Sequence, residues 1–151
     1  MLKTDIVFTK QAKIRKTDRN STFLRVYPGS PREHCLFGAT SSYEDSHNAR
    51  VYVKILQNVN FGDYRMVEVI PTSTTNKPMS LADMERITKD KTKMLFFRHC
   101  SVMADQLFGN TYYMAEHRAI PVEILQVTDC GDFCFAEVLL KEDFENAVEQ
   151  L

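Results

Sequence analysis

Cysteine and histidine are the side chains of this sequence best suited to metal or nucleophilic chemistry, and two cysteines fall in one short segment. The stretch VTDCGDFCFAEV (127–138) holds Cys130 and Cys134 with three residues between them. Two cysteines at this spacing in a hairpin are compatible with half of a zinc site, but a complete site needs two more ligands. Cys130 and Cys134 are therefore metal candidates only in part, and two buried, inert cysteines are the simpler interpretation.

Histidine stands directly before cysteine twice, at His34-Cys35 and at His99-Cys100. Neighbouring residues of a helix point about 100° apart, so neither dipeptide can form a catalytic dyad by itself. A cysteine–histidine pair would have to come from two elements, for example His34 with Cys100. His99 falls on an apolar stripe, where it is either a general base or a hydrogen-bonded core residue.

A third group of polar side chains is the segment Glu44-Asp45-Ser46-His47. Two carboxylates and an imidazole can bind a metal or perform acid–base catalysis, yet Asp and Ser also gather in ordinary turns. The sequence has no phosphate-binding glycine loop, no H-E-x-x-H and no G-x-S-x-G motif. We therefore expect a protein that is not an enzyme and that binds no cofactor. The enzyme alternative is a small hydrolase or a metal-dependent enzyme, whose candidate catalytic residues are Glu44, Asp45, His47 and His99.

The predicted elements indicate a single α+β domain over residues 1–151, with a mostly antiparallel sheet packed against one long central helix that is either continuous or broken in two. Alternating side chains predict a hairpin from Arg50–Gln57 and Tyr64–Pro71. Further predicted strands are Asp5–Thr9, Thr22–Tyr27, Cys35–Ala39 and Thr111–Glu116, while residues 10–20 are read as a loop or exposed turn of helix. The segment 72–79 is a possible internal seam.

The central helix is predicted from Ser80, which has Asp83 three residues later in a variant of the capping box. Apolar positions then recur at helical spacing as far as Phe108, although the run KDKTK (89–93) can break the helix in two. Gly109 fits a C-terminal cap. A short helix is expected near 142–150.

The hairpin spanning Pro121–Leu140 can pair in two registers. A three-residue turn gives four apolar pairs, Val122–Val138, Ile124–Ala136, Leu125–Phe135 and Val127–Phe133. A two-residue turn gives only Leu125–Ala136 and Val127–Cys134, and it sets Asp129 against Asp132. Since apolar cross-strand pairs stabilise a hairpin and like charges destabilise it, we expect the first register, with Gly131 in a left-handed conformation.

Composition limits the classes of function that remain. The formal net charge of −1 disfavours a general polyanion binder, and 44% hydrophobic residues are ordinary for a globular domain. No secretory signal or membrane-spanning run is found, so a cytoplasmic protein with reduced cysteines is expected. Charge is uneven: residues 1–33 carry eight bases and three acids, whereas residues 129–151 carry one base and seven acids.

These observations favour a small regulatory protein that binds and modulates another macromolecule, with another protein as the expected partner. A small domain without motifs and with reduced cysteines would also suit an accessory protein of a large DNA phage that acts on a host factor, although no particular residue carries that likeness. Basic and aromatic side chains are the expected contacts, since aromatics are enriched at binding hot spots: Lys10, Lys13, Arg15, Lys16, Arg19, Phe61, Tyr112 and Tyr113. The alternative is a nucleic-acid-binding module built on the basic segment 10–19, extended by Tyr52, Lys54 and Arg65. Oligomeric state is not predicted.

Overall fold

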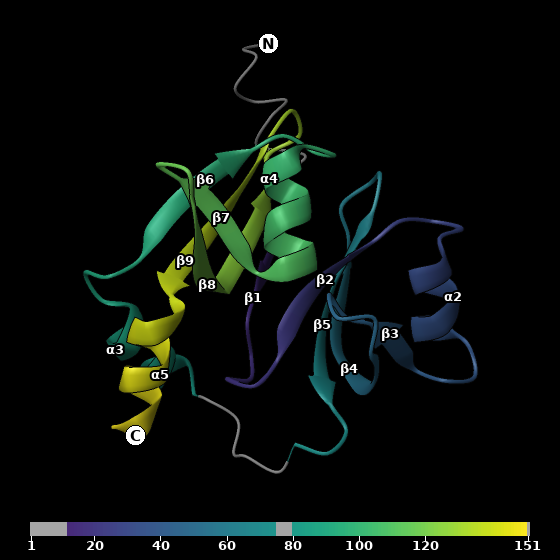
Figure 1. Cartoon of the computed structure of the whole chain (residues 1–151), viewed down its shortest axis with the longest axis horizontal. Helices are drawn as coiled ribbons and strands as arrows, with labels where there is room; N and C mark the ends of the chain where they lie inside the picture. Colours follow the sequence, from purple (N-terminus) through teal and green to yellow (C-terminus); the bar gives the residue numbers. More distant parts are fainter. Residues whose placement is uncertain (1–11, 75–79, 151) are drawn as a thin grey trace.

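Two antiparallel sheets form the framework of the protein (Figure 1). The computed structural model describes residues 12–74 and 80–150. The five-stranded sheet runs in the order β1 (Ala12–Arg15), β8 (Arg118–Asp129), β9 (Cys134–Leu140) and β6 (Lys93–Phe97), with β7 (Tyr112–Ala115) also paired to β8. The four-stranded sheet runs in the order β2 (Thr22–Val26), β5 (Arg65–Pro71), β4 (Arg50–Asn60) and β3 (Ser42–Glu44).

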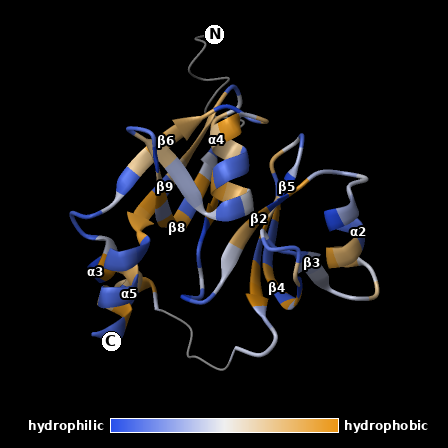
Figure 2. Ribbon diagram, viewed as in Figure 1, coloured by the Kyte–Doolittle hydropathy of each residue, from blue (hydrophilic) through white to orange (hydrophobic). Residues whose placement is uncertain are grey.

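Both sheets contribute to the largest hydrophobic core. Phe23, Tyr64 and Met66 of the four-stranded sheet pack in one cluster with Leu95 and Val127 of the five-stranded sheet. The short helix α4 (Val102–Asp105), which continues as the π-helical turn η1 (Gln106–Asn110), adds its buried side chains to this cluster. Figure 2 shows the hydrophobic residues along the strands of both sheets and hydrophilic residues in the connecting loops. The shared core makes the two sheets one α+β domain.

Three further helices cover the outer faces of the sheets. Helix α2 (Pro31–Phe37) buries Leu36 against the four-stranded sheet, on the face opposite the shared core. Helices α3 (Leu81–Thr88) and α5 (Lys141–Glu149) pack together over one end of the five-stranded sheet, around Leu125 and Leu139. In the described part of the chain, no helix covers the rest of that outer face.

The prediction of a long central helix is wrong. The Ser80 hydroxyl does cap a helix by accepting from the Asp83 amide, but α3 ends at Thr88. Asp90 then adopts a positive φ of 63°, and the chain continues as strand β6 instead of a helix. In β6, Leu95 enters the core while Phe96 points to the opposite face. A short apolar run of this kind has no periodicity that separates a strand from a buried helix.

Three local predictions are also wrong. Residues 12–15 form strand β1, paired with β8, where a loop or turn of helix was expected. The segment around Cys35 belongs to α2 and not to a strand, because Ser30 caps the helix and Pro31 occupies its first turn. Gly109 lies inside η1, and Thr111 takes the left-handed position instead. The predicted strand 5–9 and most of the predicted seam lie outside the described residues.

The β4–β5 hairpin, the strand at 112–115 and the C-terminal helix are confirmed. The hairpin of β8 and β9 is confirmed too, but neither predicted register is correct. Its turn has four residues, so Asp129 pairs with Cys134 and Val127 with Ala136, and a bulge follows between Ile124 and Gln126. Gly131 has the predicted positive φ, 96°.

None of the helices in the described part of the chain has the length and hydropathy of a membrane-spanning segment.

One buried carboxylate joins the two sheets. Glu68 on β5 is fully buried and accepts five hydrogen bonds. Its donors are the Thr17 and Asp18 amides, the Thr17 and Ser21 hydroxyls and the Gln57 side-chain amide. Because residues 17–21 connect β1 of one sheet to β2 of the other, Glu68 fixes the path of the chain between the sheets.

We predict that Glu68→Gln lowers the free energy of unfolding by about 3 kcal/mol, because the amide keeps the shape but loses the charge and half of the acceptor capacity. Urea denaturation followed by circular dichroism measures the change. Glu137→Gln, at a half-buried glutamate on the outer face of β9, is the matched control and should alter stability by less than about 0.5 kcal/mol. Equal effects of the two substitutions would contradict the role assigned to Glu68.

Candidate functional site

Three side chains with different donor atoms meet at one end of the five-stranded sheet. His99 Nε2 lies 3.2 Å from Asp129 Oδ1 and 3.3 Å from Cys134 Sγ, and Sγ lies 3.8 Å from the same carboxylate oxygen. Cys134 is fully buried, and the His99 and Asp129 side chains are 15% and 7% exposed. We call this group the His99–Asp129–Cys134 cluster.

The β8–β9 turn and the end of β6 bring the cluster together. Asp129 is the last residue of β8 and Cys134 the first of β9, and the register places them directly opposite each other. Asp129 Oδ1 also accepts from the Gly131 amide at 2.9 Å, which fixes the carboxylate inside the turn. His99 follows β6, where Cys100 adopts a positive φ of 58° before Ser101 caps α4.

Tyr64 reaches the cluster from the other sheet. Its hydroxyl lies 3.2 Å from Cys134 Sγ, and its ring packs edge-on against the His99 imidazole with centroids 5.1 Å apart. Burial and the hydrogen bond to Cys134 raise the pKa of Tyr64 above its ordinary value. The neutral hydroxyl is therefore retained and holds the sulfur in place.

The geometry does not fit nucleophilic catalysis by Cys134. Burial, with a further contribution from the Asp129 carboxylate, raises the pKa of the Cys134 thiol from 9.0 to about 11, although the Tyr64 hydrogen bond opposes the shift. A cysteine nucleophile needs a lowered pKa and access to substrate. A catalytic triad also uses the two ring nitrogens separately, whereas here Cys134 and Asp129 both face His99 Nε2.

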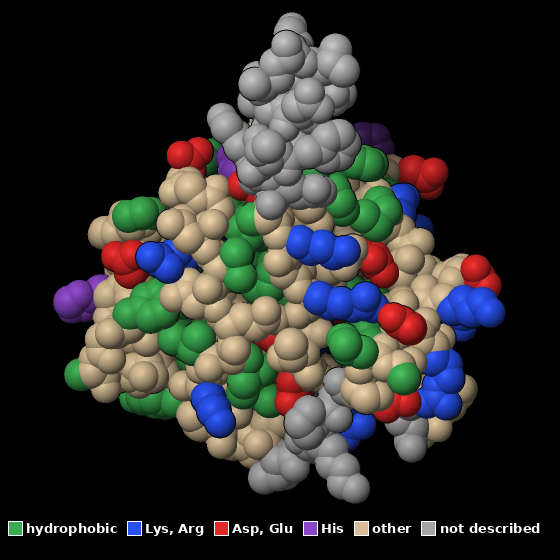
Figure 3. Space-filling model, turned by 180° about the vertical axis from the view of Figure 1, so that it is seen from behind, with side chains coloured by type: hydrophobic (Ala, Val, Ile, Leu, Met, Phe, Trp, Pro, Cys, Tyr) green, Lys and Arg blue, Asp and Glu red, His purple; other side chains and the backbone are tan. Residues whose placement is uncertain are grey.

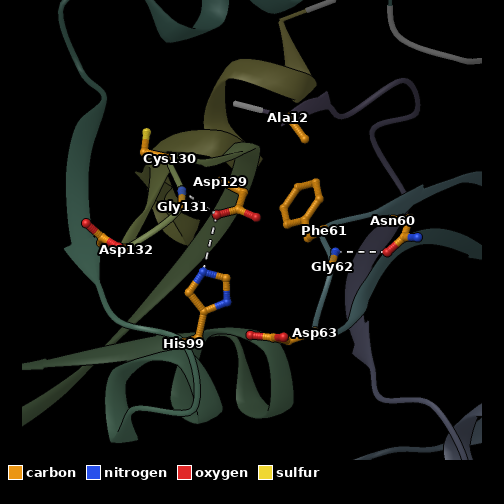
Figure 4. Close-up of a pocket in the computed structure, with 10 residues that line it drawn as sticks. All are labelled: Ala12, Asn60, Phe61, Gly62, Asp63, His99, Asp129, Cys130, Gly131 and Asp132. Carbon is orange, nitrogen blue, oxygen red and sulfur yellow. Dashed lines mark hydrogen bonds and ion pairs between the residues drawn. The ribbon is translucent and has the colours of Figure 1, made fainter. Parts of the chain in front are cut away.

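A pocket of about 450 Å³ opens beside the cluster (Figure 4). His99 and Asp129 line it from one side, and Phe61, Gly62 and Asp63 of the β4–β5 turn line it from the other. Asp132 adds a carboxylate from the β8–β9 turn, so acidic side chains predominate among the charged groups of the lining. The pocket suits a small cation or a polar ligand better than a large anion.

The comparisons with known proteins identify no relative. No family model matches the chain, and no curated protein or solved structure matches it significantly. The functional assignment therefore has to come from the geometry of this chain.

The structure brings together some of the residues predicted to bind metal or catalyse a reaction and separates others. Cys134 meets His99, but Cys130 lies buried in the turn and is not part of the cluster. The only group of potential metal ligands among residues 12–74 and 80–150 is the His99–Asp129–Cys134 cluster, so Glu44 and His47 form none. Asp45 Oδ1 instead accepts from the His47 and Ala49 amides, which makes the segment a turn.

The predicted partner-binding residues are scattered. Lys13 is exposed on β1 and Arg15 and Arg19 are half-buried, but Lys16 is buried, where it pairs with Glu123 at 2.8 Å and lies over the Phe144 ring. Lys10 falls outside the described residues.

The predicted aromatic anchors lie mostly inside the protein. Phe61 and Tyr113 belong to the shared core, while Tyr112 is half-buried. Buried rings of this kind contribute to stability and are not available to a partner in this structure.

Sequence reasoning did not identify Asp129 and Tyr64 as site residues. In the sequence, Asp129 has the character of a turn residue. Its contact with His99 and Cys134 follows only from the correct hairpin register, which sets Asp129 opposite Cys134. Tyr64 is 70 residues from Cys134 in the sequence, so no local pattern could connect the two.

We predict that alkylating reagents separate the four cysteines by exposure. Cys100 is exposed and Cys35 is half-buried, whereas Cys130 and Cys134 are buried. Native protein treated with iodoacetamide should therefore be modified first at Cys100, while Cys134 should react only as fast as the protein opens. Peptide mass spectrometry over a time course gives the order. Modification of Cys134 as rapid as that of Cys100 would contradict its assignment as a buried thiol.

Proposed function

We propose that this protein is a non-enzymatic interaction domain that binds another protein through the outer face of its five-stranded sheet. The observation that carries the proposal is a cluster of three aromatic rings on that face, of which Phe96 and Phe133 are exposed and Phe135 is half-buried. Phe96 is 63% exposed, and its ring lies 6.0 Å from Phe133 and 5.8 Å from Phe135, measured between centroids. With Met94, which is also exposed, these three rings form what we call the aromatic face.

Strand register explains why these side chains share a surface. One row across the sheet is Lys13, Thr128, Phe135 and Phe96, and the next is Arg15, Gln126, Glu137 and Met94. The residues between them in each strand, such as Val127 and Leu95, enter the shared core. Helices α3 and α5 cover only the far end of this face, so no helix within residues 12–74 and 80–150 lies above the aromatic rings.

Exposed aromatic side chains in contact with each other are unusual on a protein that acts alone. A binding surface commonly has an aromatic centre and a polar rim that excludes water. Lys13, Arg15, Gln126 and Glu137 supply such a rim on the same two rows. Figure 3, which views the molecule from behind, shows hydrophobic side chains reaching the surface beside lysine and arginine.

Nucleic acid is the second candidate, because Lys13 and Arg15 lie on the same face as three aromatic rings. Basic residues and exposed rings are the elements of a single-strand binding surface. Glu137 is opposite Met94 within this surface, however, and its carboxylate would repel a phosphate backbone. The mixture of charges therefore supports a protein partner better.

We predict that Phe96→Ser combined with Phe133→Ser weakens partner binding by at least about 30-fold without unfolding the domain, since an aromatic hot spot contributes about 2 kcal/mol or more. The partner is first isolated with tagged protein from nuclease-treated lysate, and affinity is then measured with purified components. Tyr52→Ser is the matched control, because Tyr52 is 57% exposed but lies on the four-stranded sheet. It should leave the affinity unchanged.

The outcome separates the candidates. A partner that is lost on nuclease treatment and whose affinity falls steeply with added salt would favour nucleic acid. Equal binding by the wild type and the Phe96/Phe133 variant would reject the aromatic face as the contact surface.

A further inference from the structure

We propose that the His99–Asp129–Cys134 cluster is a binding site for a divalent transition metal of intermediate softness, with zinc as the best fit. The ligand atoms are His99 Nε2, Asp129 Oδ1 and Cys134 Sγ. This inference is independent of the aromatic face and does not rest on the proposed protein interaction.

Distances between the three atoms fit a tetrahedral metal. Typical zinc bonds to sulfur, nitrogen and oxygen imply donor-to-donor separations of about 3.3 to 3.6 Å. The three separations in the structure are 3.2, 3.3 and 3.8 Å. The side chains would need to move by only a few tenths of an ångström, on the order of ordinary thermal displacement.

The types of ligand point to zinc among common metals. Thiolate and imidazole suit zinc, whereas magnesium and calcium prefer sites built only from oxygen. Three protein ligands with a fourth position left open are characteristic of zinc sites that bind water or a further ligand. Cys134 is fully buried, while His99 and Asp129 line the 450 Å³ pocket. The open side of the cluster is therefore the pocket, where Asp63 and Asp132 add negative charge.

Hydrogen bonds alone leave the imidazole incompletely satisfied. Nε2 faces a carboxylate oxygen and a sulfur, and one N–H at this atom can serve only one of them fully. Nδ1 is buried and has no hydrogen-bond partner among the described residues. With the proton on Nδ1, the lone pair of Nε2 can accept from the Cys134 thiol, but it still faces the Asp129 carboxylate oxygen at 3.2 Å. A cation at the centre of the three atoms removes that repulsion.

Tyr64 is a positioning residue for the metal. Its hydroxyl lies 3.2 Å from Cys134 Sγ and can donate to the thiolate that forms when Cys134 releases its proton to solvent on metal binding. The bound metal would link the end of β6 to the β8–β9 turn. It would therefore stabilise the folded state by an amount that grows with the logarithm of the free metal concentration once that concentration exceeds the Kd.

The first test uses a variant with Cys35→Ser, Cys100→Ser and Cys130→Ser, in which Cys134 is the only remaining thiol. Titration with Co²⁺ should give a sulfur-to-cobalt charge-transfer band that saturates at one equivalent, and excess Zn²⁺ should remove it. This test leaves the proposed ligands unaltered, so it does not depend on whether a ligand variant folds. Absence of the band in folded protein would overturn the assignment of Cys134.

The second test measures zinc affinity by competition with a chromophoric chelator, in protein first stripped of metal. His99→Gln and Asp129→Asn should each weaken binding at least about 100-fold, since even residues behind the ligands contribute 10- to 100-fold. Tyr64→Phe should weaken it by about tenfold. His34→Gln, at an exposed histidine, is the matched control and should leave the affinity unchanged.

Circular dichroism confirms that each variant is folded before its affinity is interpreted. Native mass spectrometry then counts the bound zinc. One zinc in the wild type and none in the folded His99→Gln variant at the same concentration supports the site. Zinc retained by both folded ligand variants with wild-type affinity, or no zinc in the wild type, overturns it.

Discussion

The pairing of Asp129 with Cys134 across the β8–β9 turn is the constraint on which the two proposals depend. In this register Asp129 and Cys134 point to the inner side of the sheet, where His99 and Tyr64 meet them. The same register sends Phe135 to the outer side, next to Phe96. Because successive side chains of a strand alternate between faces, a slip by one residue would exchange the inner and outer sets. The His99–Asp129–Cys134 cluster and the aromatic face therefore both depend on the β8–β9 turn.

A second constraint is the contact between the sheets. The cluster and its pocket are built from both sheets, since Tyr64 and Phe61 come from the β4–β5 turn of the four-stranded sheet and Asp129 and Cys134 from the other sheet. The shared core brings the sheets together, and Glu68 fixes the connection between β1 and β2 with five hydrogen bonds. The position of the cluster therefore depends on the packing of the two sheets against each other as well as on the local β8–β9 turn.

The sequence predicted the elements with strong local signals. The β4–β5 hairpin, the cap at Ser80 and the positive φ of Gly131 follow from alternation and turn chemistry that neighbouring residues determine. The sequence also indicated an α+β domain. The long helix was wrong because the MLFF run of β6 is apolar on both faces, one of which is the exposed aromatic face. The register was wrong for a related reason: counting apolar pairs treats every phenylalanine as core, although Phe133 lies on the surface. Asp129 and Tyr64 could not be recognised as neighbours of Cys134 without the tertiary structure.

The most direct test of this account is the register itself. Backbone nuclear Overhauser contacts across the β8–β9 hairpin, measured on isotopically labelled protein, report which residues lie opposite each other. The account predicts cross-strand contacts between Asp129 and Cys134 and between Val127 and Ala136. Contacts between Val127 and Phe133, or between Val127 and Cys134, would contradict it, because the cluster and the aromatic face would then no longer exist as described.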